Sequence, residues 1–154
     1  MVRWFRSLLS LGRRPPPRAA ARRQVAALCW RRGAAGIEVL LVTSRETGRW
    51  VIPKGGLVEG LDEPTSAALE AEEEAGVRGS IAPRPVGEFS YLKRLKGHRV
   101  RPCVVGVYPL VVETVLEDWL ERDQRRREWV SPSVAAERVS EPELKAILKR
   151  FAPN

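Results

Sequence analysis

Short apolar runs separated by turn residues dominate the middle of the chain and predict β-strands. The runs at 24–30 and 37–43 flank a glycine-bounded turn at 33–36, which is the arrangement of a hairpin. The run at 103–112 is nearly continuous in β-branched residues, so we expect it to be a central strand, buried on both faces. The predicted strands are 24–30, 37–43, 49–52, 86–92 and 103–112.

One helix is predicted between the strands, and two more close the chain. The first begins at Thr65, tolerates Pro64 at its entrance and stops at Gly76, a residue suited to the end of a helix. Strands on both sides of a helix, followed by further helices, predict an α+β fold in which a mixed β-sheet packs between helices as an α/β/α sandwich. The closing helices are expected at 131–138 and 142–151, with Ser131 and Ser140 as N-caps.

The first helix carries three glutamates that would share one face. Glu70, Glu73 and Glu74 fall at i, i+3 and i+4, where like charges repel, and the last two lie where the helix dipole disfavours anions. A bound divalent cation such as Mg²⁺ would reverse both penalties, since it takes carboxylate and phosphate oxygens as ligands. The alternative is an ordinary solvated face. Alanines on the opposite face favour a helix that packs closely on the sheet and directs its acids to one side. They are Ala67, Ala68, Ala71 and Ala75.

The segment GGLVEGLDEPTSAALEAEEEAGV resembles the Nudix box, Gly-x5-Glu-x7-Arg-Glu-U-x-Glu-Glu-x-Gly-U, where U is apolar. The three motif acids of the carboxyl half fall on the glutamates that helical spacing had already selected. The amino half departs from the motif, with Leu69 in place of arginine and Leu61 in place of the first glutamate. These two side chains pair in the family, so their joint loss leaves no unpaired charge.

Outside the box, short segments resemble one branch of this family, the diphosphoinositol polyphosphate phosphohydrolases. The likeness extends along much of residues 22–129. Each segment is a weak signal alone, whereas the box is a strong one. The matching segments are 27–31, 40–45, 49–53, 97–99, 115–119 and 127–129.

The resemblance implies the Nudix fold and hydrolysis of a phosphoanhydride bond by water. The substrate would be an organic diphosphate or polyphosphate of the diphosphoinositol polyphosphate or dinucleoside polyphosphate type. The implied cofactor is Mg²⁺, with Mn²⁺ able to replace it, held by Glu70, Glu73, Glu74 and the backbone carbonyl of Gly55. The same three glutamates are the catalytic candidates, Glu70 either as a further ligand or as the base that takes the proton of the water.

Basic side chains are expected to grip the substrate, because arginine and lysine bind phosphate best. The chain has a net charge of +8, which favours a polyanionic partner, and the loop at 93–101 contains no acid. For each side chain the alternative is a solvated surface charge. A basic rim of this kind favours a phosphate-dense small molecule over ADP-ribose. The candidates are Arg22, Arg23, Ser44, Arg45, Lys54, His98, Arg99 and Arg127.

The chain divides into a basic N-terminal tail, residues 1–21, and a hydrolase domain, residues 22–154. Residues 1–23 hold seven arginines, no acid and three consecutive prolines, which predict a flexible arm able to touch anionic surfaces; a transit peptide is the alternative. Its apolar run is too short for a transmembrane segment. Cys29 and Cys103 lie in apolar strands, which favours buried thiols and a cytoplasmic location.

Two other functions remain open at this level. The first is an ADP-ribose or nucleoside triphosphate diphosphatase, which the box permits equally well. The second is a catalytically idle Nudix-like module that binds RNA or a regulatory nucleotide, with Leu61 and Leu69 as signs of decay. No aromatic RNA-binding motif supports the second. The tryptophans at 30, 50, 119 and 129 are more typical of packing than of a base clamp.

Overall fold

The computed structural model describes residues 21–154, so nearly all of the predicted tail lies outside the described residues. Eight strands, three α-helices and three short helical turns make up this part of the chain. In chain order they are β1 (Arg22–Gly33), β2 (Gly36–Thr43), β3 (Trp50–Val51), β4 (Lys54–Gly56), α1 (Glu63–Glu70), the π-helix η2 (Ala71–Ala75), β5 (Val77–Ile81), β6 (Gly87–Arg94), the 3₁₀ turn η3 (Lys96–His98), β7 (Val100–Val115), the 3₁₀ turn η4 (Arg122–Gln124), β8 (Arg127–Val130), α2 (Pro132–Arg138) and α3 (Pro142–Arg150).

The strands form one mixed sheet built around β1 and β7. The order β3-β2-β1-β7-β5 forms its main path, and β4, β6 and β8 pair with β1, β7 and β2 respectively. β1 and β7 run parallel from Arg22 opposite Cys103 to Trp30 opposite Val111, whereas the other pairs are antiparallel. The predicted central position of β7 is confirmed, since it pairs with β1, β5 and β6.

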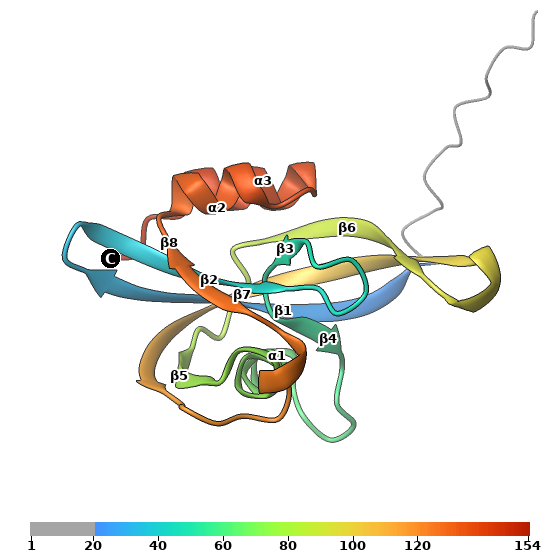
Figure 1. Cartoon of the computed structure of the whole chain (residues 1–154), viewed down its shortest axis with the longest axis horizontal. Coiled ribbons are helices and arrows are strands. Elements are labelled where there is room, and N and C mark those ends of the chain that lie inside the picture. The colour runs from blue at the N-terminus through green and yellow to red at the C-terminus, as the bar shows by residue number, and fades with distance from the viewer. Residues whose placement is uncertain (1–20) are drawn as a thin grey trace, which may run out of the picture.

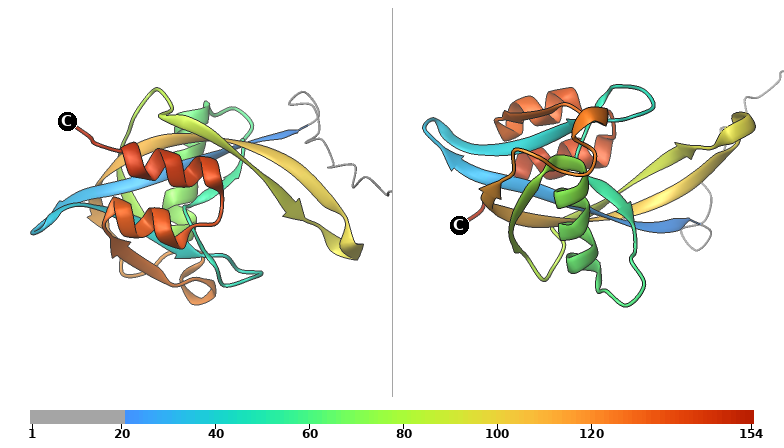
Figure 2. Two further views of the ribbon diagram at one scale, coloured as in Figure 1. Left: turned by 90° about the horizontal axis from the view of Figure 1, so that it is seen from above. Right: turned by 60° about the horizontal axis from the view of Figure 1, so that its bottom comes forward.

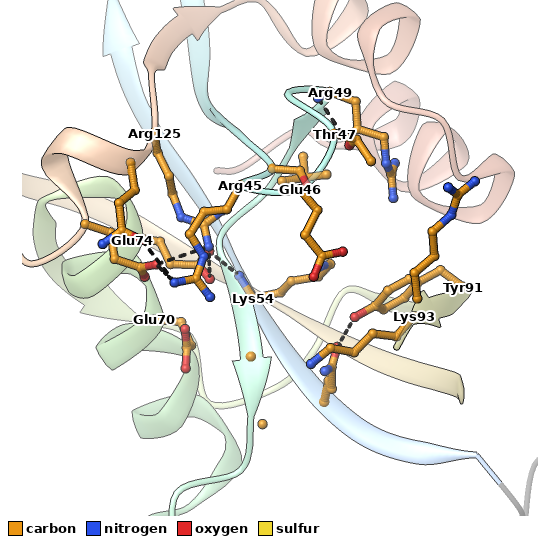
Figure 3. Close-up of a pocket in the computed structure, with 18 of the residues that line it drawn as sticks. Arg45, Glu46, Thr47, Arg49, Lys54, Glu70, Glu74, Tyr91, Lys93 and Arg125 are labelled. Atoms are coloured by element: carbon orange, nitrogen blue, oxygen red, sulfur yellow. Dashed lines mark hydrogen bonds and ion pairs between the residues drawn. The ribbon is translucent and has the colours of Figure 1, made fainter. Parts of the chain in front are cut away.

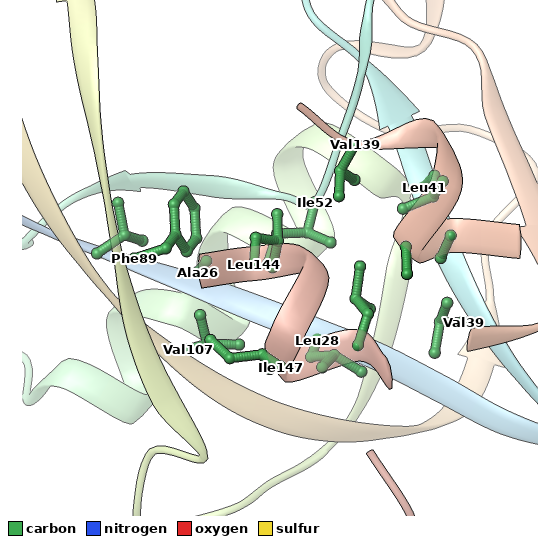
Figure 4. Packing of buried hydrophobic residues seen from close by; sticks show 14 of the residues in the cluster. Ala26, Leu28, Val39, Leu41, Ile52, Phe89, Val107, Val139, Leu144 and Ile147 are labelled. Atoms are coloured by element: carbon green, nitrogen blue, oxygen red, sulfur yellow. The ribbon is translucent and has the colours of Figure 1, made fainter. Parts of the chain in front are cut away.

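Helices cover both faces of this sheet, which confirms the α/β/α sandwich (Figures 1 and 2). Alternate residues of β1 point to opposite faces of the sheet and pack into two separate hydrophobic cores. Ala26 and Leu28 face α2 and α3, where they pack with Phe89, Leu144 and Ile147 (Figure 4). On the other face Val25, Ala27 and Cys29 pack against the buried alanines of α1 and η2. Burial on both faces explains why β1 is apolar at successive positions instead of alternating.

The sequence predicted the long elements and the short strand β3, and it missed β4, β5 and β8. β4 and β5 are rich in glycine or exposed residues, and β8 is a four-residue strand within a charged segment, so none has a clear apolar period. The Ser131 cap is confirmed, because its Oγ accepts a hydrogen bond from the amide of Val134. The Ser140 cap is wrong, since Glu141 occupies the N-cap position of α3. Within residues 21–154, no helix is long and apolar enough to span a bilayer.

Candidate active site

A cavity of about 550 Å³ lies at one edge of the sheet, between α1 and the β6–β7 hairpin (Figure 3). Several elements contribute to it. The loop after β2 supplies Ser44, Arg45 and Arg49, β4 supplies Lys54 and Gly55, and the helix supplies Glu70 and Glu74. Two further groups complete the lining: Tyr91, Leu92, Lys93 and Arg94 from β6, and Leu120, Glu121, Gln124 and Arg125 from the loop before β8. Acids and cations therefore share one concave site.

The helix that carries the acids begins two residues earlier than predicted. Asp62 is the N-cap, and its carboxylate accepts a hydrogen bond from the amide of Thr65 at 2.8 Å. At the other end Gly76 takes a left-handed conformation with φ of +65°, as predicted for a residue that ends the helix. A Cβ at this position would also collide with the Trp119 ring, so both space and conformation require glycine.

The last turn of this helix is a π-helix over Ala71–Ala75, and this changes which acids face the cavity. A π turn holds about one residue more than an α turn. Residue i+4 then stays nearly above residue i, while i+3 turns to the side. Glu70 and Glu74 accordingly line the cavity and Glu73 does not. Glu73 lies close enough to Glu70 for its charge to raise the pKa of Glu70, and its role as a metal ligand stays a prediction.

Glu74 is buried, with 7% of the residue exposed. Its carboxylate accepts hydrogen bonds from the Lys54 amide and from Arg125 Nη2, both at 3.1 Å. Burial raises the pKa of this carboxyl to about 7, against the opposing effect of the Arg125 guanidinium. The side chain is therefore close to half-protonated near neutral pH in the metal-free protein.

Glu70 lies against the backbone of Gly55. A Cβ at Gly55 would overlap the Glu70 carboxylate, so only glycine allows this approach. Burial raises the pKa of Glu70, and the neighbouring carboxylates of Glu73 and Glu121 raise it further. Two carboxyls with raised pKa values, the buried Glu74 and the half-buried Glu70, share one cavity and mark a candidate site for an added cation.

The donors present fit Mg²⁺ bound by few protein groups. Among residues 21–154, no three acidic, histidine or cysteine side chains are arranged to hold a metal by themselves. Mg²⁺ is commonly bound through one or two carboxylates plus substrate phosphates, which matches Glu70, Glu74 and the nearby Gly55 backbone. Arg125 now neutralises Glu74, with a distance of 3.1 Å between Nη2 and Oε1, and competes for the oxygen that a metal would use.

The cations of the cavity come from four separate segments. Lys54 lies with Nζ 4.5 Å from the centroid of the Tyr91 ring, and burial lowers its pKa. Arg45 contacts both Glu121 and Gln124 at 3.1 Å. Lys93, on β6, is exposed at the opposite wall. Arg49 pairs with Glu141 at 2.6 Å. An anion in the cavity would thus meet positive charge from several directions.

Of the predicted phosphate contacts, Ser44, Arg45 and Lys54 line this cavity, and the others lie elsewhere. Arg23 bridges Glu63 and Glu88 at 2.8 and 2.7 Å, and Arg22 is exposed at the start of β1. His98 and Arg99 lie exposed at the tip of the β6–β7 hairpin. They do not line the cavity.

Arg127 has a structural position instead. It donates hydrogen bonds to the carbonyls of Ala75, Gly76 and Leu116 at 2.9, 3.2 and 2.7 Å. Its guanidinium also lies 3.9 Å from the centroid of the Trp119 ring. Arg127 therefore fastens the end of the acidic helix to the loop that follows β7.

Sequence reasoning missed Arg125 and Glu121, two largely buried charges of this site. Arg125 donates to the Thr43 carbonyl at 3.0 Å and contacts Glu74 and Glu121 at 3.1 and 3.4 Å. The only signal in the sequence is a run of three arginines at 125–127, and nothing in that run shows which one turns inward. None of the tryptophans at 30, 50, 119 and 129 lines the cavity, which agrees with their packing interpretation.

The comparisons with known proteins agree with this architecture. The model of the NUDIX domain matches residues 21–151. This chain belongs to the NUDIX domain family. Its family membership confirms the resemblance carried by the box, despite leucines at 61 and 69.

Individual relatives refine the picture of this NUDIX chain. Diphosphoinositol polyphosphate phosphohydrolase 3-beta of Bos taurus is 38% identical over 111 residues, which are 70% of this chain and 63% of the relative. The chain thus spans less than two thirds of that relative's length. The crystal structure of the C. elegans Ap4A hydrolase matches with a TM-score of 0.64 and 22% identity, covering 85% of this chain and 96% of that one.

A further similar structure is a NUDIX domain solved in complex with ADP ribose. The NUDIX domain of Shewanella oneidensis NrtR, solved with ADP ribose, matches with a TM-score of 0.63 and 17% identity, covering 85% of this chain and 87% of that one. At such identities the two solved structures support the NUDIX fold and do not assign a ligand to this chain.

Proposed function

We propose that this protein is a Mg²⁺-dependent hydrolase of phosphoanhydride bonds in organic diphosphates or polyphosphates. The observation that carries the proposal is one cavity in which two carboxyls, the half-buried Glu70 and the buried Glu74, are lined up with Arg45, Lys54 and Arg125. Carboxylates can hold a divalent cation there while the basic residues hold phosphates. Mn²⁺ is proposed as a substitute metal.

The residues divide the work by position. Glu70 and Glu74, with the Gly55 carbonyl, would hold the metal, which supplies charge neutralisation on the phosphate oxygens and a lowered pKa of the attacking water. Glu70 keeps a raised pKa and lies in the cavity, so it also suits a base that takes the proton of that water. Glu73 lies next to the cavity, and its negative charge raises the pKa of Glu70.

Arg125 gives the site a second arrangement. Its contact with Glu74 compensates a buried carboxylate in the metal-free protein. A metal at Glu74 would take over that compensation and leave the guanidinium able to meet a phosphate. Since it contacts the Thr43 carbonyl as well, Arg125 remains at the wall of the cavity in either case.

The proposed substrates carry a dense run of phosphates, as in a diphosphoinositol polyphosphate or a dinucleoside polyphosphate. The cavity has positive charge on opposite walls, with Arg45 on one and Lys93 and Arg94 on the other. Two phosphates would leave part of this charge unmatched. Similarity to the bovine enzyme named for diphosphoinositol polyphosphates supports the same class. The two unpaired buried cysteines fit our proposal that the protein works in the cytoplasm.

Hydrolysis of three substrates with and without Mg²⁺ tests the proposal. We expect metal-dependent activity, with higher kcat/KM for a diphosphoinositol polyphosphate or a dinucleoside polyphosphate than for ADP-ribose. Glu74→Gln should lower activity by about a hundredfold or more, because it removes a charged metal ligand. Glu72→Gln is the matched control, since Glu72 pairs with Arg78 on the exposed side of the same turn.

Three results would contradict the proposal in different ways. Full activity of Glu74→Gln would overturn the metal assignment. ADP-ribose as the best substrate would identify a diphosphatase of that class. Tight nucleotide or RNA binding without hydrolysis of any compound would identify an idle binding module.

A further inference from the structure

The hairpin of β6 and β7 extends beyond the body of the protein, as Figures 1 and 2 show in yellow. Between residues 92 and 100 every residue except Leu95 is exposed. This segment carries no acid, and His98 lies at its tip. The cations on the arm are Lys93, Arg94, Lys96, Arg99 and Arg101.

These five cations lack the ion pairs that other arginines of the protein make. Across residues 21–154, none of them takes part in a salt bridge, whereas Arg23, Arg45 and Arg125 each contact two acids or an acid and an amide. Cations crowded on a narrow two-stranded arm repel one another. An external anionic surface would relieve that repulsion.

The same arm exposes large apolar side chains. Leu92 is 58% exposed and Val100 is 50% exposed. Leu92 pairs with Pro102 and Arg94 pairs with Val100 in the antiparallel register. Directly opposed residues and their second neighbours lie on one face, so Leu92, Val100 and Pro102 form a small apolar patch beside Arg94.

The tip of the arm is a compact turn. Gly97 and His98 both have left-handed backbone conformations, with φ of 73° and 61°. The Leu95 amide donates a hydrogen bond to the Arg99 carbonyl at 2.8 Å and closes the turn. Arg99 Nε donates a further hydrogen bond to the Lys96 carbonyl at 3.3 Å, and both Lys96 and Arg99 remain exposed, so their charged groups can meet an external partner.

An apolar patch ringed by cations is the pattern of a segment that lies at a lipid interface. The apolar groups enter the boundary between headgroups and acyl chains, and the cations are attracted to anionic headgroups. We propose that the β6–β7 hairpin docks the protein on an anionic lipid surface. A soluble phosphate compound would use the cations and leave Leu92 and Val100 without a role.

Single-stranded RNA is a poorer match for this arm, because proteins that bind it rely on stacked aromatic side chains. Tyr91 is the aromatic residue nearest the arm, and its ring lies under Lys54 Nζ, 4.5 Å from the centroid. At its base, Lys93 and Arg94 also border the cavity. Docking of the tip would thus bring the cavity mouth close to the lipid surface.

Sedimentation of the full chain with vesicles tests this inference. We expect binding to phosphatidylcholine vesicles with roughly 30% phosphatidylserine, little binding to pure phosphatidylcholine, and weakening with salt. The double variant K96E/R99E should bind about tenfold or more weakly, because each cation near the surface contributes to attraction. The control R84E/K149E changes the net charge equally at two exposed positions away from the arm. Its vesicle affinity should fall by no more than about threefold, which is half of the tenfold loss on a logarithmic scale.

A second pair of variants tests the apolar patch. Val100→Ser should weaken vesicle binding by about threefold to fivefold, since it removes buried methyl groups at the interface. Val115→Ser is the matched control, because Val115 is 44% exposed at the far end of the same strand. An environment-sensitive fluorophore on V100C should shift to the blue with anionic vesicles, and Cys29 and Cys103 are buried and should not compete for the label.

Five results would overturn the inference. K96E/R99E binding as tightly as R84E/K149E would place the lipid contact elsewhere, including residues 1–20. An unshifted fluorophore or an unchanged Val100→Ser would show that the arm does not enter the interface. Absence of vesicle binding, or preferential binding of single-stranded RNA that competes with vesicles, would reject a lipid surface. Each readout is independent of hydrolysis, so the outcome does not depend on the proposed activity.

Discussion

The two halves of the box are held in place by different interactions. In the amino half, the loop around Leu61 is fixed by neutral hydrogen bonds: the Val58 amide donates to Ser66 Oγ at 3.1 Å, and the Leu61 amide donates to the Val58 carbonyl at 3.0 Å. Charged contacts of this half lie at the start of α1, at Asp62 and Glu63. In the carboxyl half, the helix end is fixed by charged side chains. Arg125 contacts the Glu74 carboxylate, and Arg127 donates to the carbonyls of Ala75 and Gly76.

This difference explains where the sequence can depart from the family motif. Leu61 is 42% exposed and needs no charged partner, so the loop keeps its shape with a leucine there. Ser66, fully buried at the start of α1, provides a bond to the loop that does not depend on the missing pair. The carboxyl half contains the cavity acids, and there the motif is intact. Charge is retained where chemistry needs it and is dispensable where only loop shape is needed.

The largest expected effect concerns buried charge in the carboxyl half. Because the folded-state pKa of Glu74 is about 7 and its ordinary value is 4.5, the folded protein holds a proton that the unfolded chain releases between these pH values. The metal-free protein should therefore lose about 3 kcal/mol of stability as pH rises from about 5 to about 8. Glu70, whose pKa is also raised, adds to this loss of stability with rising pH.

Urea unfolding with a chelator, at about pH 5 and about pH 8, measures this loss. Glu74→Gln should remove most of the dependence of stability on pH, since glutamine carries no charge and its side-chain oxygen can still accept hydrogen bonds from Arg125 and the Lys54 amide. Glu72→Gln should keep it, because burial does not dominate there and Arg78 lowers the pKa of Glu72. Equal slopes in the wild type and in Glu74→Gln would show that buried charge does not distinguish the carboxyl half.

A smaller effect is expected from removing the clamp on the helix end. Arg127→Ala should lower stability by about 2 kcal/mol, because three carbonyls lose a charged donor and Trp119 loses its stacking partner. Arg126→Ala is the control, since the neighbouring Arg126 is exposed and its guanidinium lies 5.5 Å from the Trp50 ring centroid. Thermal melts that rank the two variants equally would contradict the clamp.

The smallest effect is expected in the amino half. Leu69→Arg alone should destabilise the protein by about 1 kcal/mol, and Leu61→Glu together with Leu69→Arg should recover about half of that. The reason is that a pair of opposite charges at the loop, where Leu61 is exposed and Leu69 half-buried, gains little over two leucines. A double-mutant cycle in thermal melts without any coupling would mean that the two positions do not meet even when charged.

Apolar periodicity in the sequence determined the sandwich. The apolar run of β1 predicted a strand, the β-branched run of β7 predicted a central strand, and the alanines of the acidic helix predicted close packing on the sheet. All of these are confirmed in the two cores. Such features are local, because the pattern of apolar and polar residues in one segment indicates directly which positions of that segment are buried.

The acids of the site were predictable only in part, because helical spacing assumes one regular helix. Glu70 and Glu74 line the cavity as spacing and resemblance indicated. The π turn at Ala71–Ala75 departs from regular helical spacing just where Glu73 lies, and nothing in the local sequence separates it from an α turn. The predicted start of the helix at Thr65 is two residues too late, since Asp62 is the N-cap and Glu63 the first helical residue. Errors of this size are usual at helix ends.

The sequence by itself determined the fold class, the acidic helix and the family, since each depends on residues that are close together in the chain. Tertiary structure alone decided which cations meet the acids. Arg125 lies 51 positions from Glu74 and contacts it, while Arg127, two residues further, turns to the backbone of the helix end. Arg125 lies in the loop before β8 and Arg127 is the first residue of that strand, so only the packing of β8 and its preceding loop decides which contacts each arginine makes.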